Sequence, residues 1–353
     1  MITLKDVARM AGVSRGTVDR VIHNRGDVSK QSFDNVMRVI QEIGYEPNIY
    51  ASILAHEMDR TVAILLPRFR SGEYWELAYR GAWQAKDYAK TFNVSIETFL
   101  YDQYELASFR EACNQLLDSS PSAVVLAPIF KNETAVLTAT LRERGIPYSY
   151  VDTKLEEDGY LTFYGMPMYN SGYLCAELLL DSFSSLPVLA ATMKVAIVRI
   201  EYDKNRKSDP TATRRAGFID YLAEHCPDVK LRSVFINPAD PEGIVASLAG
   251  FFKENPDVSH IVMFNSRVHL IAPALESLRA EQMPRVVGFD NLDDNLAALR
   301  RGTLKYLITQ HTDEQTRLAV NSLVDYLVLS KAPERRDNYM HMDILSRNNV
   351  DDY

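Results

Sequence analysis

The sequence predicts an α/β protein with a three-helix helix-turn-helix head, followed by a two-lobed domain built on parallel sheets. In residues 1–46, apolar residues recur at helical spacing between glycines and capping residues. From residue 61 onwards, short runs rich in β-branched and aromatic residues alternate with helical patterns, which is typical of parallel sheets covered by helices. Roughly ten such runs favour two sheets over one.

The head reads as three capped helices. Residues 3–6, T-L-K-D, form a capping box at the first helix start, and Gly12 ends that helix because glycine readily takes a left-handed backbone. Ser14 caps a second helix and Ser29 a third, which Gly44 ends. The third helix carries an expected apolar stripe of Phe33, Val36, Ile40 and Ile43. Two helices joined by a short glycine-containing turn make a helix-turn-helix.

The next segment, residues 47–59, reads as a linker. Pro47 interrupts the helical pattern, and residues 49–55 have a helical pattern too short to be stable alone.

The body contains the predicted strands TVAILLP, VSIETFLY, SAVVLAP, IPYSYVD, YLTFYG, KVAIVRI, LRSVFIN, SHIVMFN and RVVGFD. A return strand precedes Gln310, and the polar tail APERRDNYMHMDILSRNNVDDY reads as a last strand with a loose end. In such sheets a ligand binds at the carboxyl ends of the strands, in the crevice between the lobes.

Composition excludes several classes of protein. The chain has 353 residues and a net charge of −8, and no apolar run is long enough to span a membrane. The N-terminus MITLKDVARM lacks a signal-peptide pattern, so we expect a cytoplasmic protein. Three cysteines and seven histidines show no metal-ligand or disulfide spacing, so no metal and no cofactor are expected.

Positive charge is confined to the start of the chain. Residues 1–30 contain six Lys or Arg against three Asp, whereas residues 31–60 contain two basic and five acidic residues. Any surface that attracts nucleic acid therefore belongs to the first thirty residues.

The stretch LKDVARMAGVSRGTVDRVIHNRGDVS, followed by IGYEPNIYASILA and two α/β lobes, resembles the LacI/GalR family of bacterial transcription regulators. The resemblance is most specific over residues 3–55. Over residues 61–353 it depends on element order and on landmarks such as V-G-F-D at 287–290. It implies a periplasmic-binding-protein-like (Rossmann-like) effector domain and a homodimer on pseudo-palindromic operator DNA. A sugar or similar metabolite in the cleft would change operator affinity.

The resemblance also implies domain boundaries. Residues 1–46 would be the DNA-binding head, 47–59 the hinge helix, and 60–353 the effector-binding and dimerisation domain. The first lobe would take about 60–165 and 306–330, and the second about 166–305 with the C-terminal segment.

The second helix of the head matches the family's recognition helix. Arg15 and Gly16 occupy two base-reading positions and Arg20 a third, and an arginine can pair with guanine O6 and N7. Ser14, Thr17, His23 and Asn24 are placed for phosphate or nearby base contacts, and Thr3 and Asp19 are further DNA-binding candidates. The alternative is that the two arginines are ordinary surface charges.

Two residues of this helix depart from the family's pattern. Gly16 stands where a larger side chain is common, and it costs the helix up to about 1 kcal/mol relative to Ala. Asp19 stands where relatives often have a small hydroxyl residue, four residues after Arg15 and therefore on the same face. We hypothesise that Asp19 orients Arg15 or accepts from a cytosine N4.

The hinge helix of the family enters the minor groove. Leu54, with Ala51 and Ala55 beside it, matches the leucine that wedges between base steps, although it could instead pack within a linker helix. Here His56 follows where relatives often have a small residue.

The resemblance places effector-binding residues at strand ends. In the first lobe these are Tyr74 and Trp75, which could instead be core residues, and Asp152. In the second lobe they are Arg214, Asn265, Arg267, Asp290 and Gln310. Arg267 could favour a sugar acid or sugar phosphate over a neutral sugar, or it could be a surface charge.

The sequence therefore predicts a DNA-binding regulator of a carbohydrate-utilisation operon, with repression as the family habit; inducer and corepressor logic both fit. The main rival is a solute-binding protein of a sugar transporter, which would need a signal peptide instead of a DNA-binding head. No enzyme is expected, because the sequence lacks G-x-G-x-x-G after the first strand, G-x-x-x-x-G-K-[ST], G-x-S-x-G and H-E-x-x-H.

Overall fold

A computed structural model describes residues 4–22, 28–44, 60–156, 159–180, 193–200, 211–279 and 283–353. The chain divides into two compact units, Met1–Asp59 and Arg60–Tyr353, which we call the head and the body. None of the described helices is long and apolar enough to cross a bilayer.

The head contains three helices, α1 (Leu4–Ala11), α2 (Arg15–Ile22) and α3 (Lys30–Ile43). The described helix ends follow the predicted signals, whereas the predicted Thr3 cap lies outside the described residues. Gly12 and Gly44 take left-handed backbone, at φ 68° and 57°. The Ser14 hydroxyl accepts from the Thr17 amide at 3.1 Å, and the Ser29 hydroxyl accepts from the Ser32 amide at 3.2 Å.

The head has a small apolar core in which the three helices meet. The buried residues are Val7, Ala8, Ala11, Val18, Val21, Val36 and Val39. Phe33, which we expected in this core, is 39% exposed. Val39 is buried instead, so the buried stripe of α3 lies on a side of the helix that does not include Phe33.

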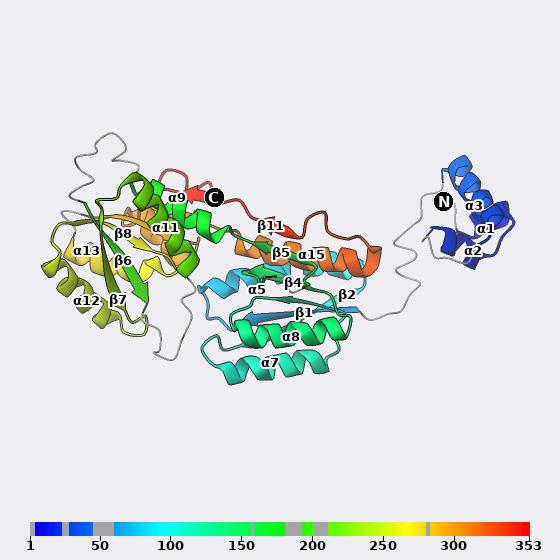
Figure 1. Cartoon of the computed structure of the whole chain (residues 1–353), viewed down its shortest axis with the longest axis horizontal. Coiled ribbons are helices and arrows are strands. Elements are labelled where there is room, and N and C mark those ends of the chain that lie inside the picture. The colour runs from blue at the N-terminus through cyan, green and yellow to red at the C-terminus, as the bar shows by residue number, and fades with distance from the viewer. Residues whose placement is uncertain are drawn as a thin grey trace. The chain divides into compact units, whose positions relative to one another are not determined.

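The body contains two lobes, each with a central sheet of six strands among the residues that the structure describes (Figure 1). The first sheet has the order β11-β5-β4-β3-β1-β2 and the second β12-β10-β9-β8-β6-β7. Every pairing is parallel except that of β10 with β12. This confirms the predicted α/β class with parallel sheets.

The first lobe uses the strands β1 (Arg60–Pro67), β2 (Val94–Tyr101), β3 (Ala123–Leu126), β4 (Tyr148–Asp152), β5 (Thr162–Gly165) and β11 (Asp337–Tyr339). Its helices are α5 (Tyr74–Gln84), α6 (Lys86–Thr91), α7 (Leu106–Asp118), α8 (Lys131–Glu143) and α15 (Thr312–Leu329). Helices α7 and α8 cover one face of the sheet, and α5 and α15 cover the other (Figure 1).

The second lobe uses the strands β6 (Lys194–Ile200), β7 (Lys230–Ile236), β8 (Val258–Met263), β9 (Arg285–Phe289), β10 (Tyr306–Thr309) and β12 (Asp343–Leu345). Its helices are α9 (Met168–Leu180), α11 (Ala212–His225), α12 (Pro241–Glu254), η2 (Val268–Ile271), α13 (Ala272–Leu278) and α14 (Asp293–Arg301). One core lies between the sheet and α12, α13 and α14, and another between the sheet and α9 and α11.

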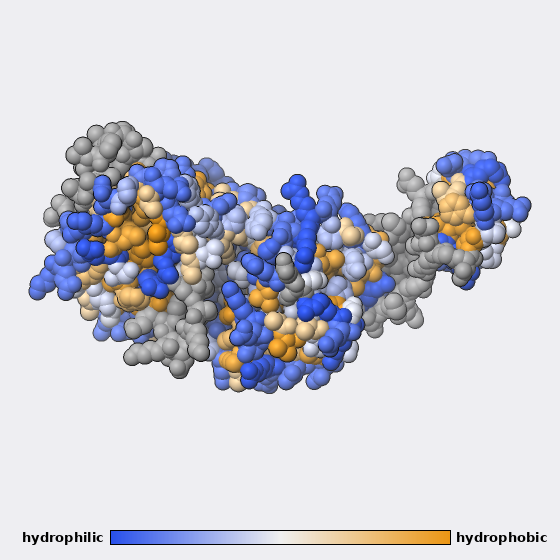
Figure 2. All heavy atoms as spheres, viewed as in Figure 1, coloured by the Kyte–Doolittle hydropathy of each residue, from blue (hydrophilic) through white to orange (hydrophobic). Residues whose placement is uncertain are grey.

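The edge strand β7 leaves apolar surface exposed. Phe235 is 51% exposed there, with the Arg199 guanidinium 5.1 Å from its ring centre. Apolar residues gather on the same face of the second lobe, where Figure 1 draws β6 and β7 (Figure 2).

In the part of the chain that the structure describes, three crossings connect the lobes: after β5, after β10, and between β11 and β12. We expected residues 306–330 in the first lobe and the tail as one strand. Instead β10 pairs with β9 in the second sheet, and α15 packs against α5, β4 and β5 of the first lobe. The tail forms two short strands, one in each sheet. Strands of three residues carry too weak a pattern for the sequence to show that the tail contains two strands instead of one.

Candidate functional site

Helix α2 of the head exposes a short polar face. Arg15, Gly16 and Arg20 are exposed, whereas Val18 and Val21 on the other side are buried in the core of the head. The core therefore fixes which side of α2 is available to a partner. This is the face on which sequence analysis placed the base-reading residues.

Ser14 and Thr17, which flank that face, contact each other at the start of α2. The hydroxyl groups of Ser14 and Thr17 lie 2.9 Å apart, and Thr17 and Asp19 are half-buried. The DNA-contact predictions for Thr3, His23, Asn24, Ala51, Leu54 and Ala55 fall outside the described residues.

The body has a cleft of about 930 Å³ lined by both lobes. All eight predicted effector residues line it: Tyr74, Trp75, Asp152, Arg214, Asn265, Arg267, Asp290 and Gln310. Most of them follow the carboxyl ends of parallel strands, where loops from different strands converge. A cleft of this size fits a small molecule.

On the first lobe, a tyrosine and a carboxylate form a pair. Tyr74 begins α5, and its hydroxyl donates to Asp152 Oδ1 at 2.6 Å. Asp152 ends β4 with left-handed backbone at φ 67°, which turns the chain at the cleft. Burial raises the pKa of Asp152, although the Tyr74 hydroxyl and the Arg214 charge both act to lower it. Trp75 is only 6% exposed and also belongs to the core.

On the second lobe, Arg214 of α11 is buried at 6% exposure. Its Nη1 donates to the Phe264 carbonyl at 2.5 Å and its Nε to the Ser171 hydroxyl at 3.0 Å. The guanidinium lies 3.9 Å from the ring centre of Phe289. Burial lowers the pKa of Arg214, while the nearby carboxylate of Asp290 acts in the opposite direction.

A close contact between α9 and α11 fixes the backbone at Arg214. A Cβ atom at Gly172 would lie 1.7 Å from the Arg214 carbonyl oxygen, and one at Gly217 would lie 2.0 Å from the Tyr169 carbonyl oxygen. Both positions therefore need glycine for close approach rather than for an unusual backbone angle. This close contact was not predictable from the sequence, because each glycine stands inside an ordinary helical pattern.

Asp290 is the most deeply buried carboxylate of the cleft, at 2% exposure. It follows β9 with φ 70° and accepts from Gln310 Nε2 at 2.8 Å. Burial raises its pKa to about 6, although Arg214 and Gln310 act to lower it. Gln310 Oε1 is buried and makes no hydrogen bond within the part of the chain that the structure describes.

Gln315 links the two lobes and was not predicted. Its Oε1 accepts from the Asp152 amide at 3.1 Å, and its Nε2 donates to the Gln310 carbonyl at 2.7 Å. The two strand ends that carry Asp152 and Gln310 are thus joined by one fully buried side chain. Gln315 stands in the polar first turn of α15, so no sequence pattern set it apart from its exposed neighbours.

The remaining predicted residues lie nearer the opening. Asn265 Oδ1 accepts from the Arg267 amide at 2.9 Å, so it shapes the loop after β8. The Arg267 guanidinium lies 3.6 Å from the Glu73 carboxylate of the other lobe. Lys154 pairs with Asp337 and Tyr160 at another part of the lining.

The comparisons with known proteins cover both units. Residues 3–48 match the family described as bacterial regulatory proteins, lacI family, and residues 62–331 match the periplasmic binding protein domain. The transcriptional regulator AscG of Escherichia coli strain K12 is 23% identical over 299 residues, 83% of each chain. The ribose operon repressor of Halalkalibacterium halodurans is 30% identical over 130 residues, 37% of this chain and 38% of the repressor.

A solved structure extends the similarity to the whole body. The structure described as a LacI transcriptional regulator from Bacteroides fragilis is 30% identical, with a TM-score of 0.76. The match covers 84% of this chain and 100% of the solved one.

Proposed function

This chain belongs to the LacI family of DNA-binding transcription regulators, and we propose that a neutral monosaccharide in its cleft controls how tightly its head binds operator DNA. The family is one of regulators rather than enzymes. The observation that carries the proposed ligand is the pair of carboxylates, Asp152 and Asp290, that line one cleft with the buried Arg214.

The charges of the cleft favour a neutral polyhydroxyl ligand. Carboxylates accept hydrogen bonds from sugar hydroxyl groups, and both carboxylates stand at strand ends facing the cleft. A phosphate or uronate would have to approach Asp152 and Asp290 together, which costs electrostatic energy in a buried site. Arg214 is the buried cation of the cleft, and its hydrogen bonds to Phe264 and Ser171 already use part of its donor capacity within the protein.

The charge of Arg267, which sequence analysis considered for an acidic ligand, is met by Glu73 across the cleft. Aromatic side chains that line the cleft supply faces for the apolar side of a sugar ring: Tyr74, Trp75, Tyr104, Phe163, Tyr169, Phe264 and Tyr339.

Control of DNA binding would follow from two arrangements of the lobes. A ligand held by both lobes favours the arrangement in which both sets of contacts form, and it changes operator affinity only through that preference. We propose repression, as the name of the similar ribose operon repressor describes for that protein. We also propose a cytoplasmic homodimer, because two heads related by a two-fold axis match a pseudo-palindromic operator.

In the head, we propose that Arg15 and Arg20 read base edges in the major groove and that Asp19 orients Arg15 or accepts from a cytosine. Support comes from the exposure of both arginines on one side of α2 and from the family match over residues 3–48. An Asp19→Ser variant should then prefer a different operator sequence. Unchanged preference together with unchanged affinity would remove the role of Asp19.

The proposed function is tested in two steps with the full chain. Selection from random duplex DNA should yield a pseudo-palindromic operator. Thermal-shift titrations with neutral pentoses and hexoses, uronates and sugar phosphates should then show stabilisation by a neutral sugar, which also changes operator affinity in a fluorescence-anisotropy assay. Stabilisation by acidic sugars alone would refute the neutral ligand, and binding without any effect on operator affinity would refute the control.

A further inference from the structure

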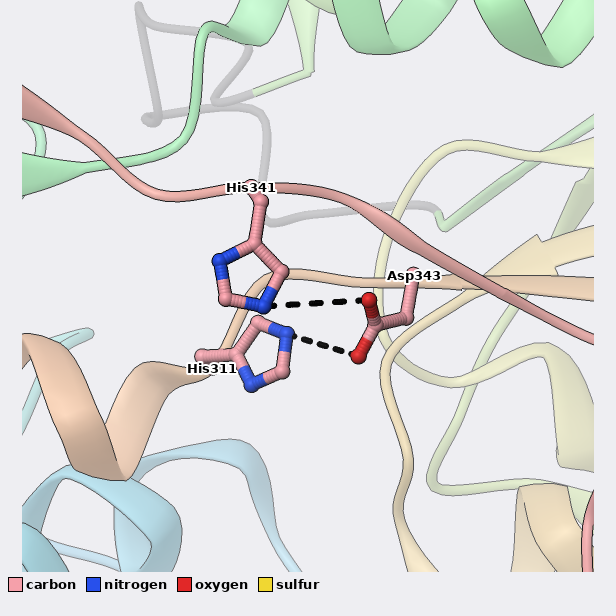
Figure 3. Close-up of side chains that lie close together, drawn as sticks. All are labelled: His311, His341 and Asp343. Carbon is pink, nitrogen blue, oxygen red and sulfur yellow. Dashed lines mark ion pairs between the residues drawn. The ribbon is translucent and has the colours of Figure 1, made fainter.

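Two of the crossings between the lobes run side by side and bring three metal-ligating side chains together. His311 lies between β10 and α15, and His341 and Asp343 lie where the chain passes from β11 to β12. Asp343 pairs across the second sheet with Thr309, two residues before His311. The three side chains point toward one another from these two crossings (Figure 3).

The donor atoms are close enough to share an ion. His311 Nε2 lies 2.9 Å from Asp343 Oδ2, and His341 Nε2 lies 3.8 Å from Asp343 Oδ1. The two imidazole rings have centres 4.3 Å apart. One donor atom from each residue lies within 4.8 Å of the others. Two imidazole nitrogens and one carboxylate oxygen form a ligand set that suits borderline transition metals.

The contacts within this triad leave a polar atom unsatisfied. His311 Nε2 is buried and makes no hydrogen bond with any residue that the structure describes, although the Asp343 carboxylate oxygen is 2.9 Å away. The distance is that of an ion pair, but the direction is not that of a hydrogen bond. A buried ring nitrogen of this kind needs a partner, and a cation between the nitrogen and the carboxylate would supply one.

We propose that His311, His341 and Asp343 bind a divalent transition-metal ion of the Zn²⁺ class, with water completing the coordination. Zinc bonds of about 2.0–2.2 Å place tetrahedral ligand atoms about 3.3–3.6 Å apart, so side-chain shifts of about 1 Å complete the site. His341 is 67% exposed and has room to make that shift. Mg²⁺ and Ca²⁺ prefer oxygen ligands, and the two imidazoles therefore select against them.

An ion at this position would hold together two of the crossings between the lobes, and we call it the clamp. An ion held by both crossings favours the lobe arrangement in which the three ligands are together. Gln310 precedes His311 and donates to Asp290 in the cleft, so the clamp adjoins a residue of the cleft. Metal and sugar should consequently change each other's affinity by the same factor. This coupling rests on the proposed function, whereas the metal binding does not.

The test is a calorimetric titration of the untagged, chelator-treated full chain with Zn²⁺, without sugar or DNA. One equivalent should bind, and Co²⁺ should give the visible absorption of a four-coordinate site. His341→Ala and Asp343→Asn should each weaken binding at least about tenfold. His225→Ala is the matched control, because His225 is exposed on α11 and stacks on Tyr221, outside the triad. His311→Asn tests the third ligand, and asparagine is chosen because it tolerates the left-handed backbone at position 311.

Equal Zn²⁺ binding by the wild type and the His341→Ala and Asp343→Asn variants would overturn the site, as would the lack of any stoichiometric binding. The coupling is measured separately, by comparing the sugar affinity in the presence of Zn²⁺ with the sugar affinity in the presence of a chelator. If Zn²⁺ binds at the triad and leaves sugar affinity unchanged, the site stands and the coupling is refuted. Failure of all sugars to bind would refute the proposed function without affecting the calorimetric result.

Discussion

The carboxylate of Glu73 and the guanidinium of Arg267 lie 3.6 Å apart across the cleft, the first on the first lobe and the second on the second lobe. Both side chains are partly exposed, at 35% and 24%. The pair therefore joins the lobes at a place where solvent screens its attraction. It also means that the charge of Arg267 is compensated by the protein itself.

Replacing Glu73 by Gln should weaken sugar binding only slightly. Exposed ion pairs contribute about 0.2–1 kcal/mol, which corresponds to a factor of less than about five. The difference between wild type and variant should disappear at high salt concentration. Titrations at low and high ionic strength measure it. A loss of more than tenfold that persists in high salt would mean that Glu73 contacts the ligand directly.

Replacing Arg214 by Lys keeps the charge but loses the bonds to Phe264 and Ser171 and the stacking on Phe289. We expect a loss of about 1–3 kcal/mol in the free energy of unfolding and at least about tenfold weaker sugar binding. Arg215→Lys, the next residue on α11 and less buried, is the control. Denaturant unfolding and thermal-shift titration give the two quantities. Normal sugar affinity in the Arg214→Lys variant would exclude a ligand role.

The pKa of about 6 at Asp290 predicts a pH dependence. An ordinary aspartate has a pKa of 3.8, so between pH 3.8 and about 6 the folded chain keeps a proton that the unfolded chain has lost. The contribution of Asp290 to the free energy of unfolding therefore falls as pH rises through this window. Sugar affinity should change in the opposite direction, because the ionised carboxylate accepts more hydroxyl hydrogen bonds.

We expect affinity to fall by up to about tenfold per pH unit below pH 6. Titrations from about pH 5 to about pH 8 measure this fall, which Asp290→Asn should abolish. The exposed Asp293→Asn variant is the control and should keep it. An unaltered pH profile in Asp290→Asn would assign the titration to another group.

Replacing Gly172 by Ala should destabilise the second lobe. The added Cβ would lie 1.7 Å from the Arg214 carbonyl, so α9 and α11 must separate, at a cost of about 1–3 kcal/mol or more. Gly250→Ala in α12 is a matched control, because its added Cβ would meet open space, with no atom within 4 Å beyond the backbone of its own helix and its two chain neighbours. That variant should be about 0.5–1 kcal/mol more stable than wild type. Equal effects of the two substitutions in denaturant unfolding would contradict the packing argument.

Replacing Gly16 by Ala should separate helix stability from DNA binding. The added Cβ would have Ser14 Oγ at 3.8 Å as its neighbour, an ordinary contact, and alanine favours the helix by up to about 1 kcal/mol. The methyl group stands on the exposed face beside Arg15, so we expect operator binding weaker by about 1 kcal/mol or more and unchanged sugar affinity. Operator affinity equal to wild type would show that this position does not approach the bases.

Local patterns were sufficient for the head. Gly12, Ser14, Ser29 and Gly44 act at helix ends as their residue types predict, because caps and left-handed turns depend on a few neighbouring residues. The expected burial of Phe33 was wrong, because its exposure depends on how α3 rotates against the other helices. That rotation is a property of the packed core.

The cleft was predictable in outline. Strand ends in parallel sheets meet at one edge, and this rule together with the family resemblance brought all eight residues to the same cleft. The hydrogen bonds among them, such as those of Gln315, required the tertiary structure. So did the division of residues 306–345 between the lobes, because strands of three or four residues carry little pattern of their own.

The sequence by itself determined the capped helices of the head, the alternation of strands and helices, and the membership of the family, all of which depend on residues near one another in the chain. Only the tertiary structure decided which distant residues meet. Gly172 lies against Arg214 and Glu73 lies beside Arg267 because helices and lobes pack in one particular way. His311 meets His341 and Asp343 because two crossings run side by side, and the whole of α15 and β11 between them in the chain hides that contact from any spacing rule.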